Sequence, residues 1–560
     1  MDVPLYLEPR LESRLASLLR ARTFLHTLAG GLGSPLNVVL PDRIAENLAA
    51  FRAVYRRHHL SGGIFFAHKA NRSSALVRRL AATEAAVDVA SLGELQHALG
   101  SGFVPDRIMA TGPKNPEFLW LAARSGTTVN IDSPAELDEL AALVRDYGLP
   151  RLRILLRLSG FCTPGVRLLT RQSRFGTAEA ELDGLLKSVE RHRDAVELTG
   201  VGYHLDTTSP AEKAVALEGC VKALDTCRAR GFTPRAVDIG GGFGTDYLAD
   251  GAQWQRYTTE LTNAALGTRP PMTWRRHTYG LRNENGTLRG ALALYPAHRP
   301  TAGAQYLDAL LSLPAPSLGR PLATLLLENL YELHTEPGRA LVDQCGVTLA
   351  RVLEVRRTEA TDRTGLSDRR EATDRRETAD DRTDPSDRRE ATDDRTDLSD
   401  RTDPSDRTDD ADRAAAAGRT GPGPLLVRLD ANADDIGLEE HGVLVDPVLV
   451  PRAAPGGAPD AGPVTCYLAG NLCLEADMIT RRAVHLPSAP RPGDLLAFAN
   501  TAGYCMDFSA DEAQQHPVAR KVAVWQDGPA DGTGREDASW HWCLDEQYWP
   551  HVNRRTKGPA

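Results

Sequence analysis

Short apolar runs alternate with longer segments of helical periodicity along the first 340 residues of the chain. The run at 63–67 is apolar enough for a buried strand and leads to Lys69, after which a helical pattern begins at Ser73. A succession of eight such units predicts an α/β fold, a (β/α)8 barrel. The predicted barrel strands are residues 64–67, 86–90, 107–110, 127–131, 154–158, 201–205, 236–239 and the run that enters Thr335.

The pattern changes after the barrel. Short β-rich runs separated by turn residues predict an all-β C-terminal domain with strands at 346–355, 427–429, 442–450, 464–469, 495–499 and 519–525. Residues 358–423 interrupt this domain with a repeat of Arg, Asp, Thr, Ser, Glu and Pro. Because the repeat has almost nothing apolar to bury, we expect a disordered insertion without a catalytic role.

Four parts of the chain follow from these patterns. We expect an N-terminal segment at 1–35 that packs on the β domain, a barrel at 36–340, a β domain at 341–357 and 424–560, and the insertion at 358–423. A second, irregular segment at 273–314 has the Gly, Asn and Pro content of an insertion, and its pattern indicates no role.

Composition and charge narrow the function. The 560 residues carry a net charge of −9, and outside 358–423 the basic residues form no blocks, which argues against a nucleic-acid or anionic-membrane partner. No run approaches a membrane span, and the N-terminus has no apolar signal region. The eight cysteines are scattered without a CxxC pair, so we expect a reduced, cytoplasmic location and assign no metal site.

Several short motifs carry candidate chemistry. Lys69 at a strand end can form a Schiff base when it is stripped of water. The glycine run 240–242 leaves backbone N–H groups open to a phosphate, and Glu336-Pro337-Gly338-Arg339 places a carboxylate beside a guanidinium. Taken singly, each has an ordinary explanation: a solvent-exposed lysine, a turn and a surface ion pair. Further motifs are 87–95, Gly202-Tyr203-His204, the segment 470–477 around Cys473, and 501–504 ending in Tyr504.

In this combination and order, the motifs resemble those of the fold-type III pyridoxal-phosphate decarboxylases, the family of ornithine, diaminopimelate and arginine decarboxylases. The resemblance covers about 32–524 apart from the insertions. It implies an alanine-racemase-like barrel followed by an all-β domain, pyridoxal 5′-phosphate as cofactor, and decarboxylation of an amino-acid substrate. It also implies a homodimer with two shared active sites.

The resemblance assigns a role to each matching residue. Lys69 would hold the cofactor, Glu336 would keep its pyridine nitrogen protonated, and Cys473, from the other subunit, would return a proton to the α-carbon. The remaining cofactor contacts would be Gly240, Gly241, Gly242, Arg339, Tyr504 and Thr207 at the phosphate, His204 stacked on the ring, Arg157 near the phenolic oxygen, and Asp88 and Glu94 as residues that orient Lys69 and His204.

The expected substrate-binding residues are Leu474, Glu475 and Asp477, and here the chain departs from the family. Diaminopimelate decarboxylases usually carry glutamate after the cysteine and ornithine decarboxylases carry aspartate, whereas this chain has Leu474. An apolar side chain cannot pair with a distal ammonium, although Glu475 is a candidate replacement. His68 also departs from the residue common at its position. These differences favour a specialised amino acid or amino-acid conjugate as substrate.

Two other functions stay open at this point. Amino-acid racemases share the barrel, but their lysine motif continues differently from Asn71-Arg72-Ser73-Ser74, and they commonly place an arginine rather than a carboxylate on the pyridine nitrogen. A non-catalytic binding protein of decarboxylase shape is the other alternative, although such homologues typically lose parts of the cofactor site. A cofactor absorbance band that disappears in Lys69→Ala would separate the enzymes from the binding protein.

Overall fold

The computed structural model describes residues 4–162, 173–205, 207–357, 424–437, 445–452, 462–508, 511–526 and 540–550. The predicted disordered insertion at 358–423 lies outside the described residues, as do 442–444 of one predicted strand. Within the described ranges, no helix is long and apolar enough to cross a membrane.

Eight parallel strands form the barrel, and the predicted (β/α)8 architecture is confirmed. An isolated parallel bridge between Ile64 and Thr335 joins the first strand of the sheet to the last, which closes the ring. The strands are β2 (Phe65–Ala67), β3 (Ala86–Val89), β4 (Ile108–Ala110), β5 (Thr128–Ile131), β6 (Leu152–Ser159), β8 (Val196–Gly202), β9 (Ala236–Asp238) and β12 (Glu332–His334). A two-residue strand, β7 (Thr177–Ala178), extends β6.

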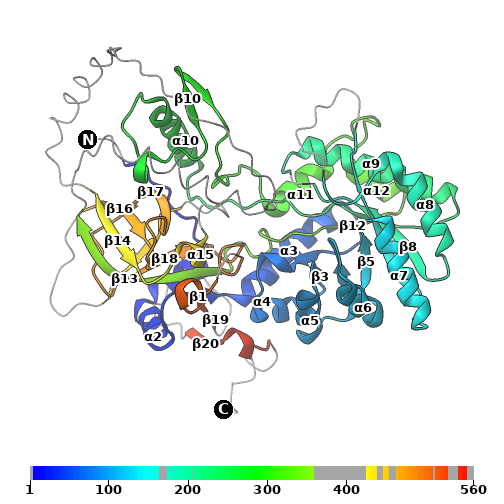
Figure 1. The fold of residues 1–560 in the computed structure, drawn as a ribbon, viewed down its shortest axis with the longest axis horizontal. Helices are drawn as coiled ribbons and strands as arrows, with labels where there is room; N and C mark the ends of the chain where they lie inside the picture. The colour runs from blue at the N-terminus through cyan, green and yellow to red at the C-terminus, as the bar shows by residue number, and fades with distance from the viewer. Residues whose placement is uncertain are drawn as a thin grey trace, which may run out of the picture. The chain divides into compact units, whose positions relative to one another are not determined.

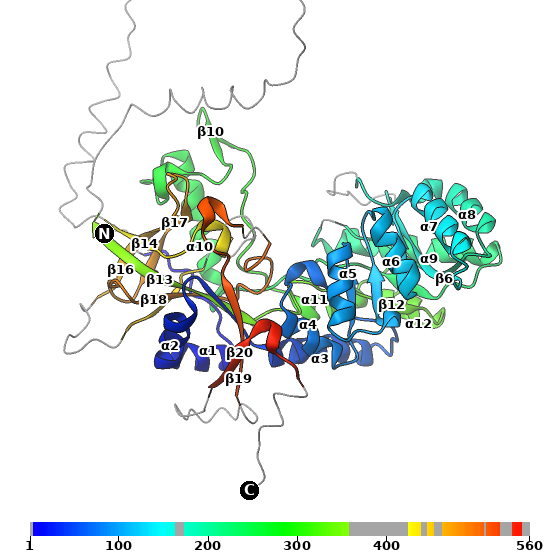
Figure 2. The same ribbon diagram turned by 60° about the horizontal axis from the view of Figure 1, so that its bottom comes forward.

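Helices surround the barrel strands (Figures 1 and 2). Four of these helices have a serine as N-cap, whose side chain accepts a hydrogen bond from a backbone N–H of the first turn; the four residues are Ser73, Ser91, Ser133 and Ser209. Because serine is a preferred N-cap residue, the sequence indicates where these helices begin. The helices are α3 (Pro41–Arg57), α4 (Ser74–Ala81), α5 (Leu92–Gly100), α6 (Pro116–Ser125), α7 (Pro134–Asp146), α8 (Leu182–Arg191), α9 (Pro210–Ala229), α11 (Gly303–Ser312) and α12 (Leu322–Glu328).

The irregular segment contains more structure than its sequence indicates. Between α10 (Gly251–Leu266) and α11 lies a hairpin of β10 (Arg282–Glu284) and β11 (Thr287–Arg289). The chain after the hairpin, at 291–302, returns to the barrel, where Tyr247 N–H donates to the carbonyl of Ala297 over 2.9 Å.

The C-terminal domain is built on a second sheet of nine strands. Its strands are β1 (Leu36–Val39), β13 (Gly346–Arg357), β14 (Leu425–Leu429), β15 (Val448–Val450), β16 (Val464–Ala469), β17 (Met478–Leu486), β18 (Leu495–Ala499), β19 (Arg520–Gln526) and β20 (Trp540–Leu544), and a short helix, α15 (Ala433–Ile436), follows β14. Strands β17 and β20 were not predicted.

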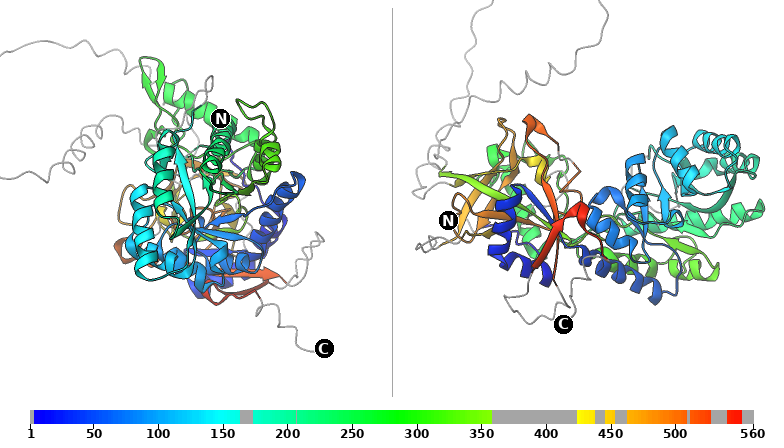
Figure 3. Two further views of the ribbon diagram at one scale, coloured as in Figure 1. Left: turned by 90° about the vertical axis from the view of Figure 1, so that its right-hand side faces the viewer. Right: turned by 90° about the horizontal axis from the view of Figure 1, so that it is seen from below.

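Strand β1 corrects one predicted boundary. Leu36–Val39, which we placed at the start of the barrel, pairs antiparallel with β13 and parallel with β19, so it belongs to the C-terminal sheet. All four residues are buried. Because a short buried strand has the same sequence pattern in either sheet, the local sequence does not show which strand it pairs with. Helices α1 (Ser13–Arg20) and α2 (Arg22–Leu32), dark blue in Figure 3, pack into one apolar cluster with this sheet.

A loop of the C-terminal sheet, 500–506, lies against the carboxyl ends of β2 and β12. Tyr504 N–H donates to the carbonyl of Ala70 over 2.9 Å, and the Asn71 amide donates to the carbonyl of Ala502 over 2.8 Å. Arg339 donates to the carbonyl of Gly503 over 3.0 Å. The first two bonds fix Ala70 and Asn71, the residues that directly follow Lys69.

Candidate active site

A cavity of about 1070 Å³ opens at the carboxyl ends of the barrel strands, where parallel α/β proteins place their chemistry. It is larger than the range of roughly 300–1,000 Å³ common for small-ligand sites. The predicted site residues that line it are Lys69, Arg157, His204, Thr207, Gly241, Gly242, Glu336, Arg339 and Tyr504. The structure therefore brings together residues that are spread over more than 400 positions of sequence.

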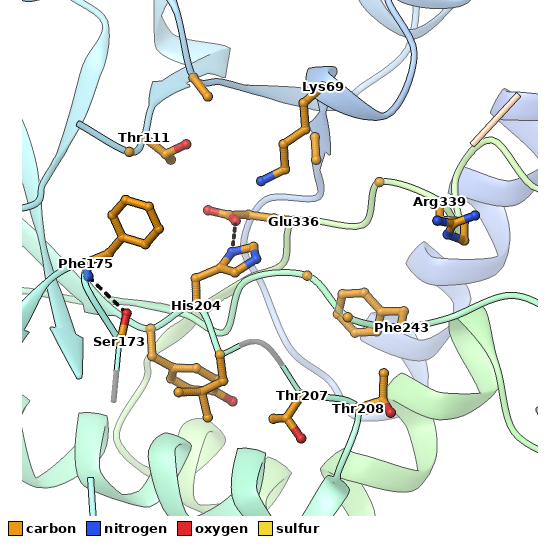
Figure 4. Close-up of a pocket in the computed structure, with 18 of the residues that line it drawn as sticks. Lys69, Thr111, Ser173, Phe175, His204, Thr207, Thr208, Phe243, Glu336 and Arg339 are labelled. Atoms are coloured by element: carbon orange, nitrogen blue, oxygen red, sulfur yellow. Dashed lines mark hydrogen bonds and ion pairs between the residues drawn. The ribbon is translucent and has the colours of Figure 1, made fainter. Parts of the chain in front are cut away.

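Lys69 lies in a 3-10 turn (His68–Ala70) that directly follows β2. Its side chain extends into the cavity toward Glu336, as Figure 4 shows. Burial alone would lower the pKa of Lys69, but the nearby Asp88, Tyr504 and Glu336 groups raise it overall. Without a ligand, the amine is thus an ammonium at neutral pH, and the ionised Glu336 carboxylate faces it.

Glu336 is the charged member of a buried acid cluster. Its carboxylate accepts a hydrogen bond from His204 Nδ1 over 2.8 Å. Burial would raise its pKa, but His204, a hydrogen bond from Asp238 and the Lys69 charge lower it to about 2. Burial and the adjacent Glu336 charge raise the pKa of Asp238 well above its usual range, which keeps Asp238 protonated.

Asp88, at the end of β3, lies behind Lys69. It is buried and accepts a hydrogen bond from the Thr111 hydroxyl. Burial and the Glu336 charge raise its pKa to about 8, so in the cofactor-free protein it is largely protonated at neutral pH. Near neutral pH the cavity therefore contains a neutral carboxyl group, Asp88, and a charged one, Glu336.

Glu94 and His68 form a separate buried pair next to the lysine turn. Glu94 accepts the Ala90 N–H over 2.7 Å, and its other oxygen lies 3.5 Å from His68 Nδ1. Burial would raise the pKa of Glu94, but the hydrogen bond and charge of His68 lower it overall. His68 Nε2 in turn lies 2.7 Å from His97 Nδ1, and burial lowers the pKa of His97 to about 4. The linked side chains of Glu94, His68 and His97 orient the turn that carries Lys69.

Arg157, at the end of β6, lies on the opposite side of the cavity. Its Nη1 lies 3.3 Å from Asp132 Oδ1, and its guanidinium lies 4.8 Å from the ring centroid of Phe175. These two contacts fix the charge at the cavity wall, where an anionic oxygen of a ligand would meet it.

The glycine loop after β9, residues 240–242, forms a concave backbone surface, here called the glycine cradle, in which side chains at these positions would not fit. Gly240 and Gly242 have φ values of +61° and +83°, in the left-handed region that favours glycine. A Cβ on Gly241 would lie 2.9 Å from the Glu336 carbonyl oxygen, and one on Gly242 would lie 2.9 Å from the Thr207 carbonyl oxygen. Backbone N–H groups of such a loop are open to an anion.

Arg339 is fixed at the same end of the cavity. It donates to the Tyr247 hydroxyl over 2.6 Å, and its guanidinium lies 5.0 Å from the ring centroid of Tyr504. A Cβ on Gly338 would lie 2.7 Å from the Tyr504 hydroxyl, so the glycine of the Glu-Pro-Gly-Arg motif makes room for this tyrosine. A guanidinium, a tyrosine hydroxyl and a glycine loop together fit a phosphate group.

These features fit pyridoxal 5′-phosphate. The glycine cradle with Arg339 would take its phosphate, the charged Glu336 would face its ring nitrogen, and Lys69 offers the amine to hold it.

Four residues near the cavity were missed by the sequence analysis. Asp238 lies two positions before the first residue of the glycine run, so its position was a usable signal. Lys213, Arg299 and His97 carried none, because only the packing of α9, the irregular segment and α5 brings them to the site.

The Cys473 loop lies elsewhere. No residue of 470–477 is among the described residues that line the cavity. Cys473 is exposed, Leu474 is 58% exposed, and the exposed Glu475 carboxylate pairs with Arg275 over 2.7 Å. In this chain, therefore, the three residues face outward.

Asp477 is held inside its own loop. Its carboxylate is buried and accepts the N–H groups of Leu472 and Ala433 over 2.8 and 2.9 Å. These bonds show that Asp477 shapes the loop that carries Cys473, whereas its contact with a substrate stays a prediction.

Comparison with known proteins places these features in context. Residues 42–276 match the family model described as "Pyridoxal-dependent decarboxylase, pyridoxal binding domain". The chain is 29% identical over 531 residues to "Uncharacterized protein y4yA" of Sinorhizobium fredii, a match that covers 93% of this chain and 94% of that protein.

Named decarboxylases match over a shorter stretch. The chain is 30% identical over 223 residues to "Probable diaminopimelate decarboxylase, chloroplastic" of Oryza sativa, which covers 38% of this chain and 44% of that protein. The solved structure of diaminopimelate decarboxylase from Helicobacter pylori, complexed with L-lysine, aligns over 89% of this chain and 93% of that chain with a TM-score of 0.56 and 17% identity, which shows a shared fold.

Proposed function

We propose that this protein, which belongs to the fold-type III family of pyridoxal-phosphate-dependent decarboxylases, is a carboxy-lyase that removes the α-carboxylate of a specialised amino acid or amino-acid conjugate. The family, the cofactor and the reaction class predicted from the motifs are confirmed by the family model and by the named relatives. The substrate and the residue roles are our proposal. The observation that carries it is the lysine and charged glutamate that face each other beside a glycine cradle in one cavity.

The residues of the chain divide the work as follows. When bound, pyridoxal 5′-phosphate withdraws electron density from the substrate α-carbon, which lets CO2 leave. Lys69 would hold the cofactor and give way to the substrate amine. Glu336, charged because its pKa is about 2, would keep a proton on the ring nitrogen. Arg339 and the 240–242 loop would bind the phosphate, and Arg157 would bind an anionic oxygen across the cavity.

We propose a homodimer in which Cys473 of each chain serves the other chain's cavity. The exposure of Cys473 and its absence from the described lining of its own cavity support this arrangement. In that position its thiol would return a proton to the α-carbon.

Leu474 and Glu475 support a substrate unlike diaminopimelate or ornithine. Leu474 cannot pair with a distal ammonium, and the Glu475 carboxylate is already paired with Arg275. The cavity of about 1070 Å³ leaves room for a conjugated substrate. We also propose a cytoplasmic location, because all eight cysteines are free and unpaired cysteines persist in reducing compartments.

The deciding experiment measures CO2 release from the purified protein loaded with pyridoxal 5′-phosphate. Its panel holds diaminopimelate, ornithine, arginine, lysine, glutamate and conjugated diamino acids, with Lys69→Ala as the blank. We expect release from a conjugated or otherwise modified amino acid. Release only from diaminopimelate or ornithine would refute the substrate proposal, and racemisation without CO2 release would refute the reaction.

A further inference from the structure

The structure places an ammonium group behind the glycine loop. Lys213 lies in the first turn of α9 and is 1% exposed. Its Nζ donates a hydrogen bond to the carbonyl of Gly241. A Cβ on Gly242 would lie only 3.2 Å from this nitrogen, so the amine touches the loop on the side away from the cavity.

None of the described residues gives Lys213 a charge partner that would explain its burial. Among the described residues, no carboxylate forms an ion pair with it, and its other neighbours are the rings of Phe243 and Tyr306, whose centroids lie 5.2 and 6.0 Å from Nζ. Of the two acids that act on the pKa of Lys213, Glu336 is hydrogen-bonded to His204, and Asp238 is protonated.

An isolated buried ammonium is expensive for a folded protein. Burial lowers the pKa of Lys213 to about 8 against the weak opposing effect of Glu336 and Asp238, so the group stays largely charged near neutral pH. A chain that keeps such a residue at a destabilising position usually does so for function. An anion near Lys213 would compensate this charge, and the described residues do not supply one.

The anion that fits is a phosphate on the other face of the same loop. Gly241 and Gly242 line the cavity on one side and contact Lys213 on the other. A dianion bound in the cradle would lie one backbone layer from the ammonium, in a region of low dielectric where charges interact strongly.

We propose that Lys213 is a positioning residue for the cofactor phosphate, which supplies, through the glycine loop, the positive charge that compensates the bound dianion. The proposal rests on the proposed function only for the identity of the ligand. Lys213 touches neither substrate nor reacting atoms, so its effect belongs to phosphate binding and not to the chemical step.

The test compares pyridoxal 5′-phosphate with pyridoxal, which lacks the phosphate, in titrations of the cofactor-free protein followed by absorbance. Lys213→Met removes charge and donor, whereas Lys213→Gln removes the charge but can still donate to Gly241. We expect both variants to weaken pyridoxal 5′-phosphate about tenfold or more, and pyridoxal by less than about twofold. Lys187→Met, on the neighbouring helix α8, is the control and should match the wild type, because both Lys187 and its partner Asp183 are exposed.

The thermal midpoint of the same proteins separates charge compensation from structural support. Because Lys213→Met removes an isolated buried charge, the cofactor-free variant should unfold at the wild-type temperature or above, while the stabilisation by added pyridoxal 5′-phosphate should shrink. A lower midpoint with equal loss of both ligands would overturn the proposal, as would wild-type phosphate preference in Lys213→Gln.

The two proposals fail differently. If the wild type binds pyridoxal 5′-phosphate but releases no CO2 from any amino acid, the proposed reaction fails and the role of Lys213 is still decided by the titrations. If the wild type binds no pyridoxal 5′-phosphate at all, both are refuted.

Discussion

At the residue scale, the site depends on three buried acids that carry different charges. Glu336 is ionised because His204 and Asp238 bond to it and Lys69 lies near it, whereas burial keeps Asp88 and Asp238 protonated. Like charges this close cannot all ionise in a low-dielectric site, so ionising one raises the pKa of the others. Residue identity alone would treat the three carboxyl groups as equivalent.

The charge of Glu336 should be essential for turnover. We expect Glu336→Gln to bind pyridoxal 5′-phosphate within about threefold of the wild type but to lose roughly 100-fold or more in kcat, because a neutral amide does not hold the proton on the ring nitrogen. Titration and CO2 release would measure the two effects. Glu332→Gln, at the start of β12, the strand that leads to Glu336, is the control. Equal turnover in both variants would contradict the role.

Asp88 should make the cofactor-free protein sensitive to alkaline pH. Because burial raises its pKa from 3.8 to about 8, its contribution to stability is fully present below about pH 4 and is lost as pH rises through about 8. Asn at this position is neutral and still accepts the Thr111 hydroxyl bond.

We therefore expect the thermal midpoint of cofactor-free Asp88→Asn to fall less than that of the wild type between about pH 5 and about pH 9. Asp106→Asn, whose side chain is 80% exposed in the native chain, should follow the wild-type curve. Parallel curves for Asp88→Asn and the wild type would show that the acid is ionised throughout.

At the element scale, the irregular segment before α11 completes the end of the cavity that holds the glycine loop. It contributes Tyr295 and Arg299 to the lining, and Arg299 donates to the Thr208 hydroxyl over 3.1 Å. The Arg299 Nε is buried, and no described residue accepts a hydrogen bond from it. A buried guanidinium N–H without a partner at the edge of a glycine cradle indicates a ligand contact.

Arg299 should strengthen cofactor binding without changing the chemistry. We expect Arg299→Met to raise the Kd of pyridoxal 5′-phosphate about three- to tenfold and to leave kcat at saturating cofactor unchanged. Arg289→Met, in the hairpin of the same segment and mostly exposed, is the control. A changed KM for substrate with an unchanged cofactor Kd would place Arg299 at the substrate instead.

At the scale of the whole molecule, one chain holds only part of the proposed machinery around its own cavity. The lysine, the glycine loop and Glu336 line it, whereas the Cys473 loop faces outward. Two chains that exchange these loops would complete two sites, as expected for a symmetric dimer with an isologous interface.

Mixing two inactive variants tests this arrangement. We expect Lys69→Ala and Cys473→Ala to have little activity alone, with cofactor still bound in Cys473→Ala. After subunit exchange, the mixture should recover roughly a quarter of wild-type activity, since half of the dimers are mixed and each has one intact site. Two wild-type samples mixed in the same way are the control, and a mixture without recovery would assign Cys473 to its own chain.

By itself, the sequence determined the barrel, the β domain and the nine predicted site residues that line the cavity. Eight apolar strands that alternate with helices are typical of one closed fold, the (β/α)8 barrel. Because its strands are parallel, their carboxyl ends bring Lys69, His204, the 240–242 loop and Glu336 together at one end of the barrel. Local pattern and strand direction suffice for that result.

Only the tertiary structure decided where four other features belong. Leu36–Val39 pairs with the second sheet, and the Asp477 carboxylate bonds within its own loop. Lys213 contacts the glycine loop, and Arg299 lines the same end of the cavity. The position of each feature depends on packing against other parts of the chain. Whether a residue is apolar or charged does not show which distant residue it will contact. The same packing sets the charges of Glu336 and Asp88, because their pKa values depend on burial and neighbours, which a sequence alone does not contain.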